Sequence, residues 1–187
     1  MSSTRTRLLN EATRIVRRRG YTGFSYADLA GAVEIRKPSI HHHFPTKADL
    51  GLEMVIAYTA AFLSRLWAAE KSGAGAVELL EFYAGLYREG LSEGLACLCG
   101  TLAAESEAVP VEVRGAVAGF FAANFDWLTR QIEQGAAAGE LSAAADPRRA
   151  GQGFLALLQG AVFTARALDD PSLFDAVAAS AIEGLRT

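Results

Sequence analysis

Apolar residues recur every three to four positions along most of the chain, the spacing that places them on one face of an α-helix. N-cap residues, glycines and prolines mark the ends of these segments. We therefore predict helices over residues 4–19, 26–33, 37–44, 47–71, 76–92, 95–107, 111–138, 147–168 and 171–185. No convincing strand pattern interrupts them, so the sequence predicts an all-α fold of about nine helices.

The segment from Phe24 to Leu50 carries the most specific pattern in the chain. Ser25 is a good N-cap for a short helix, and Asp28 lies three residues later. A tight turn follows, and a second short helix begins near Pro38 and is broken by Pro45. Two short helices joined in this way, the second basic and polar on its outer side, are typical of a helix-turn-helix that reads DNA.

The charge distribution supports a polyanion as partner of this segment. Residues 1–50 contain nine Lys or Arg against four Asp or Glu, a net charge of +5. The whole chain carries −3, so the remainder carries −8. A basic N-terminal part on an acidic body is expected when only that part meets DNA phosphates, although a merely solvated basic face would give the same count.

Composition indicates a soluble helical protein rather than a membrane or secreted one. The 187 residues are 51% hydrophobic with 5 Pro, and the longest apolar stretch, residues 115–125, is shorter than the roughly 20 needed to span a bilayer. Arg5 and Arg7 are not followed by the apolar region of a signal peptide. Two cysteines are too few for a disulfide framework. We expect a cytoplasmic location, no membrane and no cofactor.

Candidate DNA contacts lie at or near the exposed side of the second short helix. Arg and Lys pair with guanine edges, while Ser, Lys and His hold phosphates and set register. Ile40 and Phe44 are expected to face inward. The candidate DNA-binding residues are Ser25, Tyr26, Arg36, Lys37, Ser39, His41, His42 and Lys47.

This segment resembles the N-terminal part of the TetR family of transcriptional regulators. The resemblance covers about the first quarter of the chain, and beyond it only the number and lengths of the helices. It rests on Gly20-Tyr21, Phe24-Ser25, Asp28-Leu29-Ala30, Ala32-Val33, Ser39-Ile40, His42-His43-Phe44-Pro45, Lys47 and Asp49-Leu50. The resemblance implies that Ser25, Lys37, Ser39, His42 and Lys47 contact DNA, mostly at phosphates.

Two residues depart from the family pattern. Glu34 stands in the turn where the family usually has Gly, and His41 replaces a Tyr that commonly touches phosphate. A carboxylate in the turn weakens the local attraction for DNA, and His41 supplies a donor only if suitably oriented or protonated. The run His41-His42-His43 is not expected to bind metal, because consecutive helical residues point about 100° apart.

Cys97 and Cys99 are the only thiols. They lie near the start of the sixth predicted helix, where a spacing of two places them on different faces, so joint metal binding or an easy disulfide is not expected. A free Cys is often a small buried hydrophobe, but a thiol near a helix N-terminus can react with electrophiles. The stretch Cys97-Leu98 with residues 102–105 also resembles, over a short length, a TetR subgroup that responds to electrophiles or unsaturated small acids, which implies that Cys97 is linked to the effector.

The C-terminal part is rich enough in aromatic residues to enclose a mainly apolar effector cavity, although ordinary core packing would use the same residues. With Cys97, the candidate effector residues are Trp67, Phe82, Tyr83, Tyr87, Phe121, Phe125, Phe154 and Phe163.

The last two predicted helices are rich in Gly and Ala, which lets helices approach closely. A two-fold pairing of these helices would bury an apolar row against a second copy, whereas the alternative is an intramolecular core. The candidate dimer residues are Leu155, Leu158, Val162, Val177 and Ile182.

The sequence thus predicts a helix-turn-helix domain over residues 1–46 and an effector-binding and dimerisation domain over residues 47–187. The expected function is a homodimeric repressor that a small molecule releases from double-stranded operator DNA. One alternative is a regulator that senses oxidants or electrophiles through Cys97. A small thiol enzyme or carrier is disfavoured, because all three His residues lie in the first domain, remote in sequence from Cys97.

Overall fold

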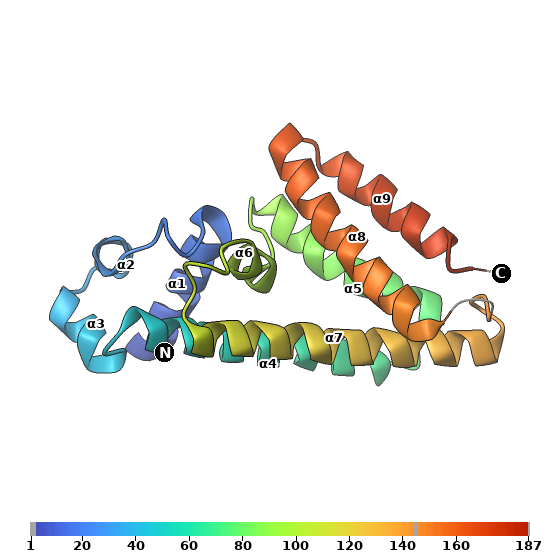
Figure 1. Cartoon of the computed structure of the whole chain (residues 1–187), viewed down its shortest axis with the longest axis horizontal. Coiled ribbons are helices and arrows are strands. Elements are labelled where there is room, and N and C mark those ends of the chain that lie inside the picture. The colour runs from blue at the N-terminus through green and yellow to red at the C-terminus, as the bar shows by residue number, and fades with distance from the viewer. Residues whose placement is uncertain (1–2, 144–145, 187) are drawn as a thin grey trace. The chain divides into compact units, whose positions relative to one another are not determined.

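The computed structural model describes residues 3–143 and 146–186, and those ranges contain helices and no strand (Figure 1). The all-α prediction is confirmed. The helices are α1 (Thr4–Arg19), α2 (Tyr26–Val33), α3 (Lys37–His43), α4 (Lys47–Glu70), α5 (Ala76–Ser92), α6 (Leu98–Ala104), α7 (Val111–Ala138), α8 (Pro147–Leu168) and α9 (Pro171–Glu183).

The chain divides into two compact units that do not follow a single cut in the sequence. We call the first the head unit; it comprises the residues up to Ala61 together with Cys97–Phe120. The body unit comprises Phe62–Ala96 together with the residues from Phe121 on. A boundary at Lys47 would assign α6 and the first part of α7 to the body, whereas both belong to the same compact unit as α1, α2 and α3.

Local side-chain caps start most of the helices where the sequence places them. Ser25 accepts a hydrogen bond from the backbone N–H of Asp28, and the Asp28 carboxylate accepts one from the Ser25 N–H, which completes a capping box. Asp146 and Asp170 cap α8 and α9, each followed by a proline at the first helical position. These contacts satisfy backbone donors that a helix N-terminus otherwise leaves unpaired.

The helix α6 is shorter than the sequence pattern suggests, beginning at Leu98 and not near residue 95. The reason is the end of α5, where the Leu95 N–H donates to the Gly90 carbonyl and the Gly94 N–H donates to the Leu91 carbonyl. With Gly94 at φ 71°, this is a Schellman motif, which needs the residues that would otherwise start the next helix.

The core of the head unit is formed by the apolar faces of its helices. Leu8, Ala12 and Val16 of α1 are fully buried, as are Leu29 of α2 and Ile40 of α3. By length and composition alone α4 could cross a membrane, but core helices of soluble proteins pass the same test. Here α4 contributes Leu50, Met54 and Val55 to the buried interior.

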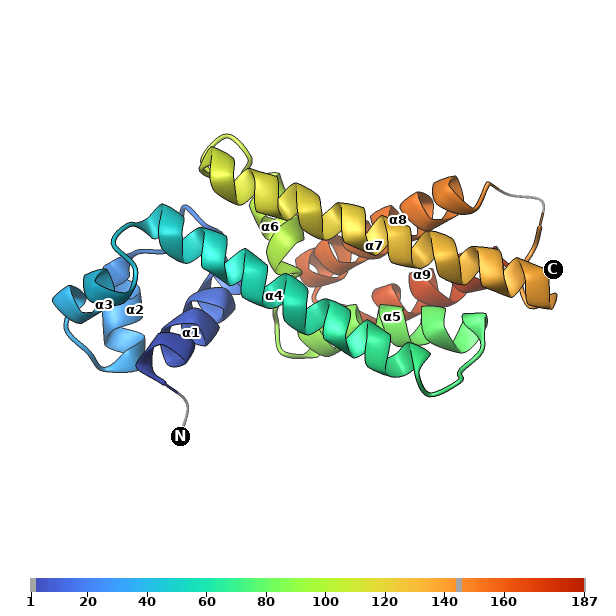
Figure 2. The same cartoon turned by 90° about the horizontal axis from the view of Figure 1, so that it is seen from below.

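In the body unit, α8 packs along α9, and α5 lies against both (Figure 2). Small residues allow close approach at the end of α7, where a Cβ atom on Gly135 would meet the Ala76 Cβ at 2.5 Å and the Leu141 Cδ1 at 2.7 Å. The body core contains Leu80, Tyr83, Trp127, Phe154 and Phe174, all almost completely buried.

Candidate nucleic-acid interface and regulatory sites

The outer face of α3 is polar, basic and open to solvent. The exposed side chains there can all donate hydrogen bonds. They are Arg36, Lys37, Ser39, His41 and His42. Ile40 and Phe44 lie on the opposite side and are fully buried. The helix therefore presents hydrogen-bond donors outward while its apolar side chains hold it against the head unit.

The Tyr26 hydroxyl holds the end of α3 from within the head unit. It lies within hydrogen-bonding distance of the carbonyls of Phe44, at 2.9 Å, and Thr46, at 2.6 Å. Burial, together with the charge of Asp49, raises the pKa of Tyr26 to about 12. Because its hydroxyl is bonded to these backbone carbonyls, Tyr26 positions the end of α3, and a direct contact of Tyr26 with DNA stays a prediction.

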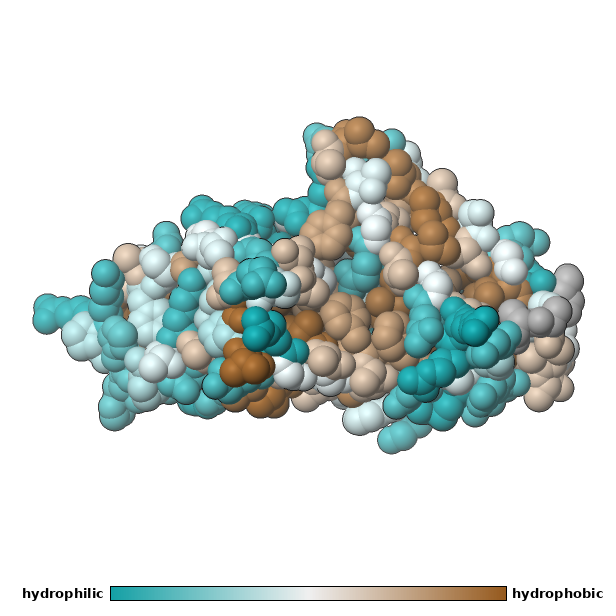
Figure 3. All heavy atoms as spheres, viewed as in Figure 1, coloured by the Kyte–Doolittle hydropathy of each residue, from teal (hydrophilic) through white to brown (hydrophobic). Residues whose placement is uncertain are grey.

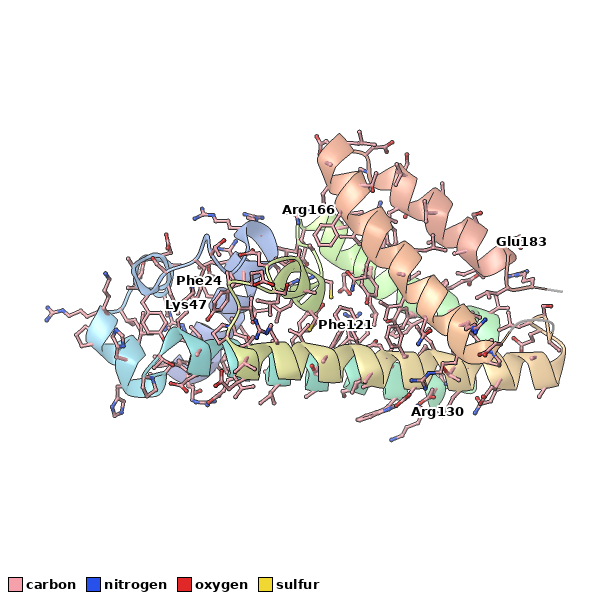
Figure 4. The ribbon with its side chains drawn as sticks, viewed as in Figure 1. Phe24, Lys47, Phe121, Arg130, Arg166 and Glu183 are labelled. Carbon is pink, nitrogen blue, oxygen red and sulfur yellow. The ribbon has the colours of Figure 1, made fainter. Side chains whose placement is uncertain are left out.

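Lys47 has a similar internal role (Figure 4). Its Nζ donates to the carbonyls of Tyr21, at 2.6 Å, and Phe24, at 2.5 Å. The same nitrogen lies 4.3 Å from the Tyr21 ring centroid and 5.2 Å from that of Phe24. Burial lowers the pKa of Lys47, against the opposing effect of Glu105 and Asp28. The ammonium group stabilises the loop between α1 and α2, so a contact of Lys47 with phosphate would need a rearranged side chain.

The side chain of Ser25 is also used locally. Its hydroxyl accepts from the Asp28 N–H and donates to the Asp28 carboxylate. Ser25 remains exposed at the N-terminus of α2, where a phosphate could approach. Its contact with DNA therefore stays a prediction.

The structure shows the conformations of Glu34 and His41, the two residues that depart from the family pattern. Glu34 adopts the left-handed conformation at φ 57° and ψ 44°, which explains why a glycine suits this position. The Nδ1 atom of His41 lies 3.1 Å from the Pro45 carbonyl, so Nδ1 carries the proton of that hydrogen bond. A neutral His41 then presents Nε2 as an acceptor, and only protonation makes Nε2 a donor to phosphate.

Glu105, which directly follows α6, links the end of α6 to the loop between α1 and α2. Its carboxylate oxygens accept from the backbone N–H of Tyr21 at 2.9 Å and of Thr22 at 2.8 Å. Gly20 has φ 88°, and a Cβ there would collide with the carboxylate. Burial acts to raise the pKa of Glu105, but these hydrogen bonds and the nearby Lys47 outweigh it and lower the pKa. Sequence reasoning missed this contact because it joins residues 84 positions apart.

A group of stacked and edge-packed aromatic rings occupies the interior of the body unit. Tyr83 stacks on Trp127 with ring centroids 5.6 Å apart, and Phe62, Tyr87 and Phe154 also pack against Tyr83. We call these five residues the aromatic cluster. The edge and stacked arrangements are those that aromatic quadrupoles prefer.

Polar atoms accompany the aromatic cluster. The Tyr83 hydroxyl donates to the Asn124 Oδ1 at 2.9 Å, and the Gln159 Nε2 donates to the Tyr87 hydroxyl at 3.4 Å. Within residues 3–143 and 146–186, two buried side-chain atoms have no protein partner, namely the Trp127 Nε1 and the Gln159 Oε1. An unpaired buried donor and acceptor each cost free energy, and a ligand or water molecule would satisfy them.

An apolar surface runs along α8 and α9 (Figure 3). A groove of about 630 Å³ between the two helices is lined by small residues together with Phe154, Leu157, Val177 and Leu185. Leu157 is 52% exposed, and Phe163 and Leu168 on the same helix are exposed as well. Leu157 and Leu168 share one face of α8, because a spacing of eleven residues is close to three helical turns. Large apolar side chains exposed together are typical of a protein interface.

Two family models together match most of the chain. The first 54 residues contain a match to the bacterial regulatory proteins of the tetR family, over residues 8–54. Residues 78–181, more than half of the chain, match the tetracyclin repressor-like C-terminal domain. The chain belongs to the TetR family of transcriptional regulators. The helices α2 and α3 thus lie in the N-terminal helix-turn-helix domain of a TetR-family regulator, and the C-terminal domain is a ligand-binding domain.

Individual relatives of this TetR-family protein are consistent with that family assignment. The transcriptional regulator AcuR of Cereibacter sphaeroides is 30% identical over 154 residues, which cover 79% of this chain and 69% of AcuR. A TetR-family regulator structure from Agrobacterium tumefaciens has a TM-score of 0.93 and 33% identity, covering 98% and 97% of the two chains. One from Legionella pneumophila has a TM-score of 0.90 and 25% identity, covering 100% and 99%. These relatives are regulators, so the enzyme alternative is discarded.

The predicted effector residues of this TetR-family protein do not all lie together in the structure. Tyr83, Tyr87 and Phe154 come together in the aromatic cluster. Trp67, which is 50% exposed, Phe82 and Phe163 lie at the surface instead, because each falls on the outer face of its helix. Phe121 and Phe125 are half-buried and stack on one another with centroids 6.5 Å apart. Cys97 belongs to the head unit.

The predicted dimer residues need a larger correction. Leu155, Leu158, Val162 and Ile182 are buried in the chain's own core, which is the intramolecular alternative. Only Val177 lines the α8–α9 groove. The exposed large apolar residues of α8 are instead Leu157, Phe163 and Leu168. Both sides of α8 carry apolar residues, so residue type alone does not separate its buried side from its exposed side.

The body core also contains polar residues that were not predicted, although their positions follow the helical pattern. Asn124 and Gln131 are almost completely buried, and they lie four and eleven positions after Phe120. These spacings place both on the inward face of α7. A buried Asn and Gln among apolar residues need hydrogen-bond partners, which could have been sought around them.

Proposed function

We propose that this TetR-family regulator is a cytoplasmic homodimer that represses transcription and leaves its operator when a small molecule binds the body unit. Two recognition helices would enter successive major grooves of double-stranded DNA, since one short helix gives little affinity alone. The effector would favour a conformation in which the two heads no longer match the half-sites, to the extent of its difference in affinity between the two states.

The observation that carries the proposal is the face of α3. Arg36, Lys37, Ser39, His41 and His42 are all exposed, while Ile40 and Phe44 anchor the helix from behind. Burial of the Arg and Lys side chains inside the protein would have ruled out DNA reading by this helix. Their exposure leaves the cations available for phosphates and guanine edges.

The aromatic cluster is the proposed effector site. It combines flat apolar walls with the unpaired Trp127 Nε1 donor and the unpaired Gln159 Oε1 acceptor. Such a site suits an uncharged, planar molecule that carries both a hydrogen-bond acceptor and a donor. Because the chain contains two Trp residues, a Trp67→Phe variant isolates the fluorescence of Trp127. An effector bound at the cluster should change that signal, and the Trp127→Phe variant serves as control.

A second copy of the chain is the proposed partner of the α8–α9 surface. Replacing the exposed Leu157 by Glu would place a carboxylate in that apolar face, so we expect the dimer to dissociate in sedimentation velocity experiments. Ile56→Glu is the matched control, since Ile56 is similarly exposed but lies on α4. Equal dissociation of both variants, or of neither, would reject the α8–α9 surface as the dimer interface.

A second candidate signal is chemical modification of Cys97. The Tyr58 hydroxyl donates a hydrogen bond to the Cys97 Sγ at 3.8 Å, so the thiol contacts a proton donor from α4. The Cys97→Ser variant separates the two signals: a thiol sensor stops responding, whereas a shape-selective effector site retains its ligand.

The decisive test of the regulator function is recovery of bound DNA fragments from the host genome, followed by gel-shift titration at low salt. We expect promoter fragments with two half-sites, and the genes beside them will indicate the effector chemistry. Failure to retain any promoter fragment at low salt would reject the proposal.

A further inference from the structure

The His41 side chain is held where α3 meets the first turn of α2. Its Nδ1 atom lies 3.1 Å from the Pro45 carbonyl oxygen. Its ring packs edge-on against the ring of Tyr26, with centroids 4.8 Å apart. Tyr26 is the first residue of α2, and its hydroxyl is bonded to the carbonyls of Phe44 and Thr46. The His41 ring is therefore fixed by two neighbours, although His41 is an exposed residue.

The Pro45 carbonyl decides which nitrogen of a neutral His41 carries the proton. A carbonyl oxygen only accepts hydrogen bonds, so Nδ1 must be the donor. A neutral imidazole has a single N–H, so the Nε2 of His41 then carries a lone pair and cannot donate. The His42 ring instead packs edge-on against His43, and no hydrogen bond within residues 3–143 and 146–186 fixes its tautomer.

The position of His41 brings it next to the part of a helix-turn-helix that meets the DNA backbone. In this motif the second helix enters the major groove while the first helix crosses the phosphates. The N-terminus of α2, with the exposed Ser25 as its cap, is a favourable place for a phosphate. The His41 ring contacts the first residue of that helix, and Lys37 lies one turn earlier on the same side of α3.

A phosphate and a neutral His41 are mismatched at this place. Phosphate oxygens only accept hydrogen bonds, and the Nε2 lone pair of His41 offers them nothing. A ring flip that turned Nδ1–H outward would break the bond to the Pro45 carbonyl. A protonated His41 keeps that bond, gains an Nε2–H donor and adds a positive charge, which makes a charge-assisted hydrogen bond to phosphate. DNA binding therefore favours the protonated form.

His42 and His43 are the rivals for any pH dependence of this surface. Histidine is the side chain that ordinarily titrates between pH 5 and 8, whereas carboxylates, lysines and arginines keep their charge over most of that range. Burial raises the pKa of Tyr26 to about 12, and hydrogen bonds from Ser25 lower the pKa of Asp28. The charged or titratable groups on α2, on its C-cap, on α3, at the start of α4 and on the nearby part of α1 are Tyr26, Asp28, Glu34, Lys37, Lys47, Asp49, Arg5 and Arg7.

We propose that operator binding by this protein is coupled to the uptake of a proton at His41, so that its affinity for DNA rises as the pH falls. The proton passes from solvent to Nε2, and no bond between heavy atoms forms or breaks. The bound state carries more protons than the unbound state, so acidification favours binding, and DNA in turn raises the affinity of His41 for a proton. This coupling rests on the proposed regulator function.

The pH dependence is measured by fluorescence anisotropy on one selected promoter fragment, at pH 6 and pH 8 and constant ionic strength. Each proton taken up changes the affinity by at most about tenfold per pH unit, and two chains bind one operator. We expect the wild type to bind at least tenfold more tightly at pH 6. His41→Gln offers a neutral donor at both pH values, so at most half of the logarithmic change should remain.

His42→Gln and His43→Gln are the matched controls, and each should keep more than half of the logarithmic change whatever its absolute affinity. A wild-type change below tenfold, or more than half of the change surviving in His41→Gln, would overturn the proposal. Loss of more than half of the change in either control would overturn the assignment to His41. Circular dichroism of the three variants should show wild-type helicity.

Two measurements on the wild type do not depend on any variant. Long-range ¹H–¹⁵N NMR of the DNA-free chain at pH 8 should show His41 protonated at Nδ1, and an Nε2–H tautomer would overturn the premise. Calorimetric titration with the promoter fragment near pH 7, in buffers of different ionisation enthalpy, should show proton uptake. Binding without proton uptake would overturn the coupling and leave the regulator function intact, whereas no binding at either pH would overturn both.

Discussion

The head unit and the body unit use their polar groups in opposite ways. In the head unit, Lys47, Glu105 and Tyr26 bind backbone groups of their own chain, and the cations on α3 stay free. In the body unit, a buried aromatic cluster leaves the Trp127 Nε1 and the Gln159 Oε1 without protein partners. A head unit held by hydrogen bonds to its own backbone suits the reading of a fixed target, whereas unsatisfied atoms in a core suit a ligand that binds and dissociates.

The largest effect is expected when the exposed cations Arg36 and Lys37 are removed. The Arg36→Ala, Lys37→Ala double variant should bind the selected promoter fragment at least 100-fold more weakly, because a dimer loses four cationic contacts. Fluorescence anisotropy titrations over a series of salt concentrations measure this loss, and urea unfolding should be unchanged. Wild-type affinity in this variant would show that α3 does not read the DNA.

The second largest effect is expected when the contact of Glu105 with the backbone of Tyr21 and Thr22 is removed. Glu105→Ala leaves the N–H groups of Tyr21 and Thr22 without their charged acceptor, so we expect the free energy of unfolding to fall by about 2 kcal/mol. Glu107→Ala, an exposed neighbour with the same charge, is the control. Urea unfolding of the three proteins decides the point, and equal stabilities would remove Glu105 from the account.

The same contact has a defined pH dependence. The pKa of Glu105 is lowered in the folded state, so its stabilisation is fully present above about pH 4.5 and is lost as the pH falls through the folded value. Between neutral pH and acid, the difference in unfolding free energy between the wild type and Glu105→Gln should therefore shrink. A difference that grows on acidification would contradict the lowered pKa.

Lys47 and Lys37 test the difference between a lysine that is bonded within the protein and a lysine that is exposed on α3. Lys47→Met should cost about 1.5 kcal/mol of stability, because two carbonyls lose a charged donor, while the salt dependence of DNA binding stays unchanged. Lys37→Met should leave stability unchanged and reduce the slope of log K against log salt by about 1 per chain. The reverse pattern would mean that Lys47 leaves its carbonyl partners to bind phosphate.

The smallest effect concerns the turn. Glu34→Gly removes a side chain from a left-handed conformation and should raise the free energy of unfolding by about 0.5–1 kcal/mol. It should also strengthen DNA binding, because a carboxylate leaves the turn before α3. Asp169→Gly is the matched control, since Asp169 has φ 52° but lies at the end of α8. That variant should gain stability without any change in DNA binding.

The sequence was informative wherever structure is decided locally. Caps such as Ser25 with Asp28, and prolines such as Pro147, predicted most helix boundaries within a residue or two. The exposed face of α3 followed from a short, specific pattern. The start of α6 was misplaced because the Schellman motif at Gly94 depends on a hydrogen bond pattern that helical periodicity does not reveal.

Sites built from distant segments could not be predicted in the same way. The pairing of Glu105 with Tyr21 and the meeting of Tyr83 with Trp127 depend on how helices pack. The side of α8 that faces outward was misjudged because Leu155 and Leu157 are equally apolar, and only the packing shows which is buried. Residue type alone does not separate a core leucine from an interface leucine.

The central claim, a symmetric pair of heads on one operator, is tested most directly by sedimentation of the chain with a selected promoter duplex and with a duplex of one half-site. We predict two chains bound to the full duplex, with affinity that falls steeply as salt rises, and far weaker binding to the half-site. One chain bound equally well to both duplexes, or no complex at low salt, would contradict the account.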